Sequence, residues 1–205
     1  MKRKIFLLGV IGNPISHSLS PSLHNDWLRQ KKLKGIYLPF EVAPARLKGF
    51  VRQMRDWKMD GLNVTLPHKE TILPLLDKIS PEAKIIGAVN LIVRKGKRLY
   101  GDNVDWIGYR NAYRKKFGSL KNKKVVVLGA GGAARAILYA LGREKAQRIV
   151  IANRTVQKGI RLARYFQKHF PKTEILNLPF QMTRLKPFLK EADLLINTTS
   201  VGLKK

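Results

Sequence analysis

Cysteine is absent from the 205-residue chain, and acidic residues are scarce, with 13 Asp and Glu against 41 Lys and Arg. Without cysteine, the chain can form neither disulfide bonds nor any metal site that needs thiolate ligands. The four histidines are scattered and lack the spacing of a metal motif such as HExxH, so we expect no metal. No apolar run is long enough to span a bilayer or to form a convincing signal peptide, which predicts a cytoplasmic protein.

The formal net charge of +28 is the most unusual property of the chain. Such an excess of cations is typical of nucleic-acid-binding proteins, because neutralising phosphates dominates their affinity. Here the basic residues are spread over nearly every predicted helix, for example at Arg29, Arg114 and Arg164, without a basic tail or a known nucleic-acid motif. We interpret them as a solvated surface that attracts anionic ligands, and keep a basic nucleic-acid-binding module as the alternative.

Strand-like and helix-like patterns alternate from end to end, which predicts an α/β protein with mostly parallel sheets. A polar, glycine-containing segment near 118–122 separates two series of these units, as linkers do. We expect an N-terminal α/β substrate domain over 1–104, a connecting helix and linker over 105–121, and a Rossmann-like dinucleotide-binding domain over 122–205.

Capping and turn residues predict several element boundaries in the first half of the chain. Ser20 and Ser80, each followed by proline, are predicted to cap helices. Pro67 is expected to end a strand, and a helix over 71–79 is expected to follow. A hairpin is predicted to turn at 95–96.

The run GAGGAA, residues 129–134, follows a buried-looking strand and opens a predicted helix. This is the context of a dinucleotide fingerprint, in which glycines let backbone N–H groups approach a pyrophosphate at the helix N-terminus. A glycine turn alone would equally suit a close-packed corner between a strand and a helix. The cofactor contacts predicted here are those of Gly129, Ala130, Gly131, Gly132 and Ala133.

The end of the next strand selects the cofactor. An NAD site would place Asp or Glu there for the ribose 2′-hydroxyl, whereas this chain has Asn153, Arg154 and Thr155, with Lys158 one turn later. A carboxylate would repel a 2′-phosphate, while a guanidinium binds one through two hydrogen bonds. The sequence therefore predicts NADP, bound in part by these four residues.

Seven motifs in this chain resemble, in order and spacing, those of the shikimate dehydrogenase family. They are GNPISHSLSPSLHN (12–25), NVTLPHK (63–69), GAVN (87–90), GDNVDWIG (101–108), GAGGAA (129–134), NRT (153–155) and NTTSVG (197–202). The resemblance covers essentially the whole chain. It implies NADPH-dependent, reversible reduction of 3-dehydroshikimate to shikimate, a step toward chorismate and the aromatic amino acids, in a cleft between two domains.

The resemblance also implies roles for individual residues. Ser18 and Ser20 would bind the substrate carboxylate, and Lys69 would be the catalytic lysine. The ring hydroxyls would be bound by Thr65, Asn90 and Asp105. Further cofactor contacts would come from the last motif, at Thr198, Thr199 and Ser200.

The chemistry of the residues agrees with these roles. Hydride delivery to a ketone leaves charge on oxygen, so a proton donor must lie beside it; Lys69 can give that proton and Asp105 can orient the ammonium. Taken alone, both would be interpreted as surface residues near helix starts. His17, His24 and His68 are interpreted as packing or capping residues with no role in proton transfer.

Two departures from the family pattern limit the prediction. Leu91 and Val104 stand where the family usually has threonine, so two candidate substrate-binding hydroxyls are missing. A quinate/shikimate dehydrogenase is the nearest alternative. The family normally continues well beyond the NTTSVG motif, so we expect a chain truncated at its C-terminus, with weak turnover or none. A cofactor-binding remnant without catalysis is a third interpretation, and a homodimer is a possible assembly.

Overall fold

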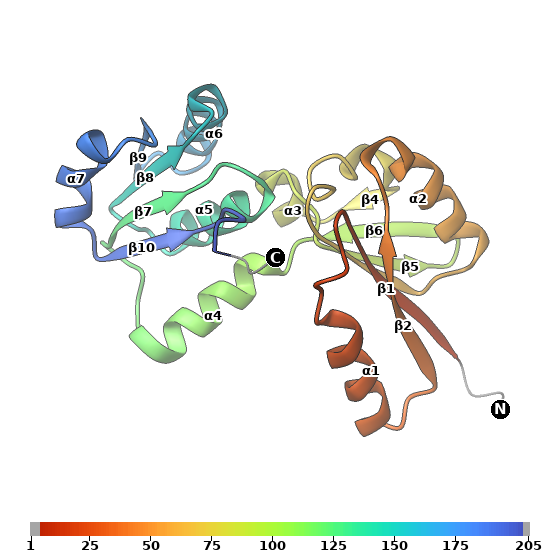
Figure 1. The fold of residues 1–205 in the computed structure, drawn as a ribbon. Coiled ribbons are helices and arrows are strands. Elements are labelled where there is room, and N and C mark those ends of the chain that lie inside the picture. Colours follow the sequence, from red (N-terminus) through yellow and green to blue (C-terminus); the bar gives the residue numbers. More distant parts are fainter. Residues whose placement is uncertain (1–4, 203–205) are drawn as a thin grey trace. The chain divides into compact units, whose positions relative to one another are not determined.

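The computed structural model describes residues 5–202, which form two compact units, 5–103 and 104–202 (Figure 1). Residues 1–4 and 203–205, the outer ends of the two expected domains, lie outside the described residues. None of the helices between residues 5 and 202 is long and apolar enough to cross a membrane. Over the same span, no three His, Asp or Glu side chains gather as a metal site requires.

The first unit combines one sheet with three α-helices and two short 3-10 helices. Its elements are β1 (Phe6–Gly12), α1 (Ser20–Gln30), β2 (Gly35–Glu41), η1 (Pro44–Arg46), α2 (Leu47–Asp56), β3 (Gly61–Val64), η2 (Leu73–Leu75), β4 (Lys78–Ile79), α3 (Pro81–Ile86), β5 (Leu91–Lys95) and β6 (Arg98–Asp102).

The sheet of the first unit has the strand order β2-β1-β3-β5-β6-β4. β1 runs parallel to β2 and to β3, and β4 runs parallel to β6. β5 is antiparallel to both of its neighbours and forms the predicted hairpin with β6. This hairpin turns at Gly96, whose φ is 62°, and Lys97, one residue later than predicted.

Helices α1 and α2 cover opposite faces of this sheet, because successive strand side chains point to opposite sides. On one face, Ile11 of β1 packs with Phe50 and Met54 of α2 in the main core. On the other, Val10 packs with Tyr37 of β2, to which α1 is attached. Since β1 lies between β2 and β3, the loop from β1 to α1 starts at the carboxyl end of a central strand.

The prediction of a helix over 71–79 is wrong. This segment forms the 3-10 turn η2 and the short strand β4. Pro74 lacks the N–H that a continuing helix would need. Beyond it, the carboxylate of Asp77 accepts hydrogen bonds from Leu99 N at 2.6 Å and from Arg55 Nη1 at 2.7 Å, which hold the chain extended beside β6.

The prediction that Ser20 caps a helix is also wrong, whereas the one for Ser80 is confirmed. Helix α1 begins with Ser20 itself, and Leu19 at the N-cap position makes no side-chain capping bond. The hydroxyl of Ser20 instead lies close to the phenol of Tyr37, where it opposes the rise in the Tyr37 pKa that burial causes. In α3, Ser80 Oγ accepts the N–H of Ala83 at 3.1 Å, as a capping serine does.

The second unit is a parallel sheet with helices on both faces. Its elements are α4 (Asp105–Phe117), β7 (Lys124–Leu128), α5 (Gly132–Arg143), β8 (Arg148–Asn153), α6 (Val156–His169), β9 (Glu174–Pro179), α7 (Met182–Glu191) and β10 (Leu194–Asn197). The strand order β10-β7-β8-β9 is that of a Rossmann half-sheet, which confirms the predicted fold class.

Helix α7 is an element that the sequence patterns did not predict, and Pro187 lies inside it although proline normally argues against a helix interior. Burial of Leu185 against Val126 and Val150 on one face of the sheet stabilises this helix nonetheless. Helix α4 begins at Asp105 as predicted and packs on α5, where Trp106 meets Tyr139 edge to face with ring centroids 5.0 Å apart.

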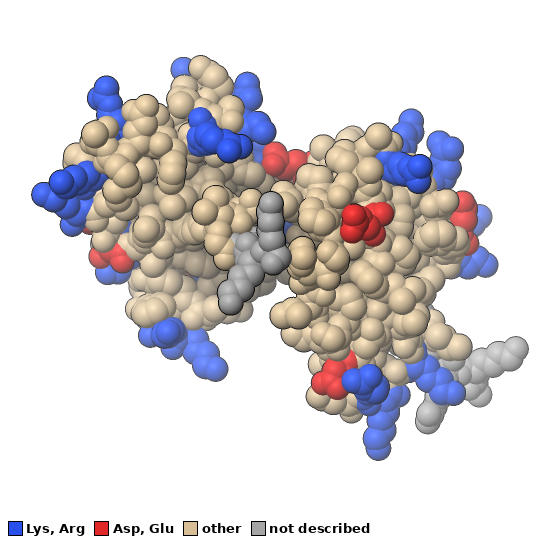
Figure 2. Space-filling model, in the orientation of Figure 1, with Lys and Arg blue, Asp and Glu red and all other residues tan. Residues whose placement is uncertain are grey.

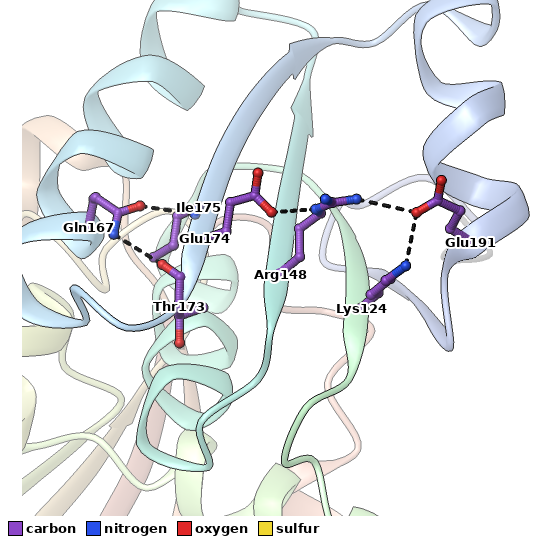
Figure 3. Close-up of polar contacts among 7 residues, drawn as sticks. All are labelled: Lys124, Arg148, Gln167, Thr173, Glu174, Ile175 and Glu191. Carbon is purple, nitrogen blue, oxygen red and sulfur yellow. Dashed lines mark hydrogen bonds and ion pairs between the residues drawn. The ribbon is translucent and has the colours of Figure 1, made fainter.

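Ion pairs join the amino ends of the strands in the second unit (Figure 3). The carboxylate of Glu191 in α7 accepts hydrogen bonds from Lys124 at 3.0 Å and from Arg148 at 3.3 Å. Arg148 also forms an ion pair with Glu174. Beside these ion pairs, the carboxylate of Asp193 accepts hydrogen bonds from Lys123 Nζ at 2.9 Å and from Lys124 N at 2.8 Å. These contacts lie at the opposite end of the sheet from the glycine turn.

The carboxylate of Asp193 should make this region sensitive to acid. The hydrogen bond from Lys123, and then the one from the Lys124 N–H, lower the pKa of Asp193. A lowered pKa contributes stability that is complete above the unfolded-state pKa and is lost as the pH falls through the folded-state pKa. We expect Asp193→Asn to lower the melting temperature by about 1–4 °C near neutral pH and to have no effect near about pH 2.

Thermal unfolding followed by circular dichroism at both pH values checks this expectation. Asp56→Asn, on the exposed side of α2, makes the same charge change and serves as the control. If Asp193→Asn lowered the melting temperature equally in acid, the charge of Asp193 would not be the cause of the destabilisation.

Candidate active site

The carboxyl ends of β1, β2 and β3 are joined by backbone hydrogen bonds at one edge of the first unit's sheet. Thr65 N donates to Ile11 O at 2.9 Å, and Asn13 N donates to Leu66 O at 2.9 Å. Gly12 lies between them, and a Cβ there would come within 2.6 Å of Thr65 Cγ2. Glycine at position 12 therefore allows the loop after β3 to approach β1 closely.

Lys69 and Asn90 lie at the same edge as Thr65. The main-chain oxygen of Lys69 accepts the N–H of Val89 at 2.8 Å, and the oxygen of Asn90 accepts the N–H of Val64 at 2.9 Å. Asn90 is buried, while Thr65 and Lys69 are half-buried. Three of the predicted substrate residues, which span 26 positions of sequence, are thus brought together by main-chain contacts.

Ser18 and Ser20 lie in the loop that leaves β1 at this edge, and both are half-buried. Ser18 N donates to Ile15 O at 3.0 Å, and Ser18 Oγ accepts the N–H of Ser20 at 3.3 Å. The second contact orders the entry to α1. Two hydroxyls beside a helix N-terminus form a suitable site for a carboxylate.

Sequence reasoning did not single out two polar residues beneath this loop, Tyr37 and Asn63. The Tyr37 hydroxyl donates to Asn63 Oδ1 at 2.7 Å, and Asn63 Nδ2 donates to Asn90 O at 3.4 Å. Burial raises the pKa of Tyr37 to about 12, so the phenol keeps its proton. The signal for Asn63 was its place between Leu62 and Val64, a polar residue on an otherwise buried strand.

Asp105 lies in the second unit, whereas the other five predicted substrate residues lie in the first. It is the first residue of α4, where the helix dipole favours a carboxylate, and it is half-buried. Asn103, two residues earlier, is fixed within the first unit by a hydrogen bond from its Nδ2 to Ala88 O at 3.0 Å.

The glycine turn of the second unit has the geometry that a pyrophosphate requires. Gly129 has φ of 107°, and a Cβ there would lie 2.6 Å from Thr198 Oγ1, so only glycine fits. Gly131, the N-cap residue of α5, is exposed, and no described atom lies within 4 Å of where its Cβ would be. Because no side chain between residues 5 and 202 caps α5, its first N–H groups can bind phosphate oxygens, which fits the predicted cofactor.

The residues after β8 also fit a phosphorylated nucleotide. Asn153 Nδ2 donates to Thr155 O at 2.8 Å, which shapes the turn into α6. Arg154 and Lys158 are both exposed on this turn and on the first turn of α6. Residues 153–158 therefore include two cations and no carboxylate, a combination that suits a ribose 2′-phosphate.

The last motif is held by its asparagine, which the sequence analysis did not assign to the site. Asn197 Oδ1 accepts the N–H of Thr199 at 2.9 Å and its hydroxyl at 2.7 Å. Thr198 Oγ1 donates to Leu128 O at 2.6 Å, which attaches the end of β10 to β7. The loop containing Thr198, Thr199 and Ser200 is therefore fixed next to the glycine turn.

Two family models match the chain. The shikimate dehydrogenase substrate binding domain matches residues 10–92, and the shikimate / quinate 5-dehydrogenase model matches residues 111–203. The curated shikimate dehydrogenase (NADP(+)) of Geobacter metallireducens is 42% identical over 201 residues, covering 98% of this chain and 70% of the relative.

Solved structures agree with these matches. Shikimate dehydrogenase from Aquifex aeolicus has 40% identity and a TM-score of 0.87, with 100% of this chain and 73% of that chain covered. Shikimate 5-dehydrogenase from Thermus thermophilus, solved with NADP(H) and shikimate, has 37% identity and a TM-score of 0.82, with 97% and 70% covered. The chain spans about 70% of the length of its curated relatives. In both sequence and fold, the chain belongs to the shikimate dehydrogenase family.

Proposed function

We propose that this chain catalyses the reaction of its family, the reversible NADPH-dependent reduction of 3-dehydroshikimate to shikimate. The match of one chain to both the substrate domain and the dehydrogenase domain carries this proposal. The named relatives are NADP-dependent shikimate dehydrogenases, which favours this function over a quinate enzyme or a nucleic-acid-binding module. The chain is accordingly an oxidoreductase of aromatic amino acid biosynthesis.

In this proposal, each unit binds a different ligand. The first binds the substrate, with its carboxylate at Ser18 and Ser20 and its hydroxyls at Thr65 and Asn90. The second binds NADP between the glycine turn, the residues after β8 and the loop after β10. A cytoplasmic location and a homodimer stay predictions from the sequence.

Lys69 acts as the proton donor in this mechanism. The bound nicotinamide supplies the hydride. As negative charge develops on the carbonyl oxygen of the substrate, the Lys69 ammonium transfers a proton to that oxygen, and in the reverse direction the amine takes it back. Asp105 orients the Lys69 ammonium and accepts a hydrogen bond from the neighbouring hydroxyl of the substrate. The main-chain hydrogen bond from Val89 N to Lys69 O holds the residue in place during this exchange.

Arg154 selects the cofactor. The guanidinium binds the 2′-phosphate through charge-assisted hydrogen bonds, and Lys158 adds a second positive charge one turn later. Gly129 and Gly131 let the main chain approach the pyrophosphate, whose charge the N-terminus of α5 stabilises.

Lys69→Ala should lower the rate of shikimate-dependent NADP reduction by about a hundredfold or more, because general acid–base catalysis is lost. The dissociation constant for NADP should stay within about twofold, since Lys69 belongs to the other unit. Nicotinamide absorbance gives the rate, and calorimetry gives NADP and shikimate binding. Lys48→Ala, an exposed lysine of α2, is the control. A near-normal rate for Lys69→Ala would show that Lys69 is not the proton donor. If the parent chain neither binds nor oxidises shikimate, the proposed function is refuted.

Arg154→Asp should weaken NADP binding by about 10–100-fold and NAD binding much less, because only NADP carries the 2′-phosphate. Arg161→Asp, on the exposed side of α6, makes the same charge change further along the helix and tests for a general effect of charge. Titration of protein fluorescence with each cofactor measures the affinities of the parent and of both variants. Equal losses for NADP and NAD would show that Arg154 does not contact the 2′-phosphate.

A further inference from the structure

The imidazole of His68 is fully buried, with 0% exposure, although it belongs to the loop that carries Lys69. Its Nε2 lies 2.6 Å from the main-chain oxygen of Val42. A carbonyl oxygen can only accept, so Nε2 carries the proton and Nδ1 is the bare nitrogen. Nδ1 has no hydrogen-bond partner among the described residues, so a second proton there would be buried without an acceptor.

The contact between His68 and Val42 joins the loop after β3 to the end of β2. Val42 is itself attached to β1, because its N–H donates to Gly12 O at 3.0 Å. The same loop is attached to β1 directly through Thr65 N and Ile11 O. The side chain of His68 therefore connects the Lys69 loop to the carboxyl ends of two other strands.

The main chain around Lys69 is thus held from two sides. On one side, the neighbouring His68 is fixed by Val42; on the other, Lys69 O accepts the N–H of Val89 at 2.8 Å. Within the loop, His68 N donates to Thr65 O at 2.9 Å, and His68 O accepts the N–H of Ile72 at 3.0 Å. A displacement at residue 68 would move both Thr65 and Lys69.

We propose that His68 is a positioning residue for the proton donor: its Nε2–H bond to Val42 O sets the place of Lys69, and the imidazole itself transfers no proton. This inference rests on the proposed function only where it concerns Lys69. The fixed tautomer, with Nε2 protonated and Nδ1 bare, is a property of the folded chain and holds whatever the substrate.

The substitutions His68→Gln and His68→Met form a matched pair for the test. Gln places an N–H donor near the position of Nε2, while Met has similar length and no donor. We expect His68→Met to lower kcat with shikimate by about 10–100-fold, because a displacement of about 1 Å at a catalytic group has effects of this size. His68→Gln should restore kcat to within about threefold of the parent, and the KM for NADP should be unchanged in both.

His169 supplies the control, because its Nδ1 also contacts a backbone carbonyl, Tyr165 O at 3.0 Å, but in the second unit. His169→Met and His169→Gln should not differ in kcat. A purely structural role for His68 would instead lower the melting temperature of His68→Met while leaving kcat, measured below that temperature, unchanged. Equal kcat values for the two His68 variants would overturn the positioning role.

A second measurement does not depend on turnover. In the parent chain labelled with 15N-histidine, the long-range NMR spectrum should show His68 with a protonated Nε2 and a bare Nδ1. A protonated Nδ1, or rapid exchange between tautomers, would overturn the inference even if the enzyme is active. Absence of shikimate binding and turnover in the parent would refute the proposed function, while this spectrum would still decide whether His68 is fixed by Val42.

Discussion

The hydrogen bond from Thr65 N to Ile11 O is the contact on which the candidate substrate site of the first unit depends. It continues the β1–β3 pairing past the end of β3 and so fixes where the loop with Thr65, His68 and Lys69 begins. Its geometry requires the absence of a side chain at Gly12, where a Cβ would come within 2.6 Å of Thr65. Around this point, parallel strands that end at one edge bring polar residues together that are distant in sequence.

The second unit applies the same constraint to a different ligand. Gly129 lets the end of β7 lie against the loop after β10, since a Cβ there would meet Thr198. Among the described residues, no side chain caps the N-terminus of α5, so an anion can bind its first N–H groups. In each unit, a glycine at the end of a central strand allows the close approach of a loop that carries residues of the proposed site.

The large positive charge is compatible with this enzyme because six of the few carboxylates form ion pairs that join separate elements of the fold. Asp60, Asp77 and Glu144 pair with arginines. Glu174 and Glu191 join the strand ends (Figure 3), and Asp193 pairs with Lys123 beside them. Lys and Arg side chains dominate the visible charged surface of both units (Figure 2). The resulting field attracts anions, and the substrate and the cofactor proposed here are both anionic.

The sequence by itself determined the alternation of strands and helices, the glycine turn, the start of α4 at Asp105 and the family, because these depend on local periodicity, on capping and on motifs of fixed spacing. It failed where distant contacts override local preference. Asp77 is held extended by Arg55 and Leu99, so the helix predicted over 71–79 does not form, and α7 accommodates Pro187 because Leu185 is buried on the sheet.

Only the tertiary structure decided which side chains meet. The side chain of Ser20 lies close to Tyr37 and does not cap a helix, and His68 is fixed by Val42. Tyr37 and Asn63 come together because they lie on the same face of two strands that flank β1. A sequence pattern records which face a residue occupies, but the register between strands decides its neighbours, and register depends on the packing of the whole sheet.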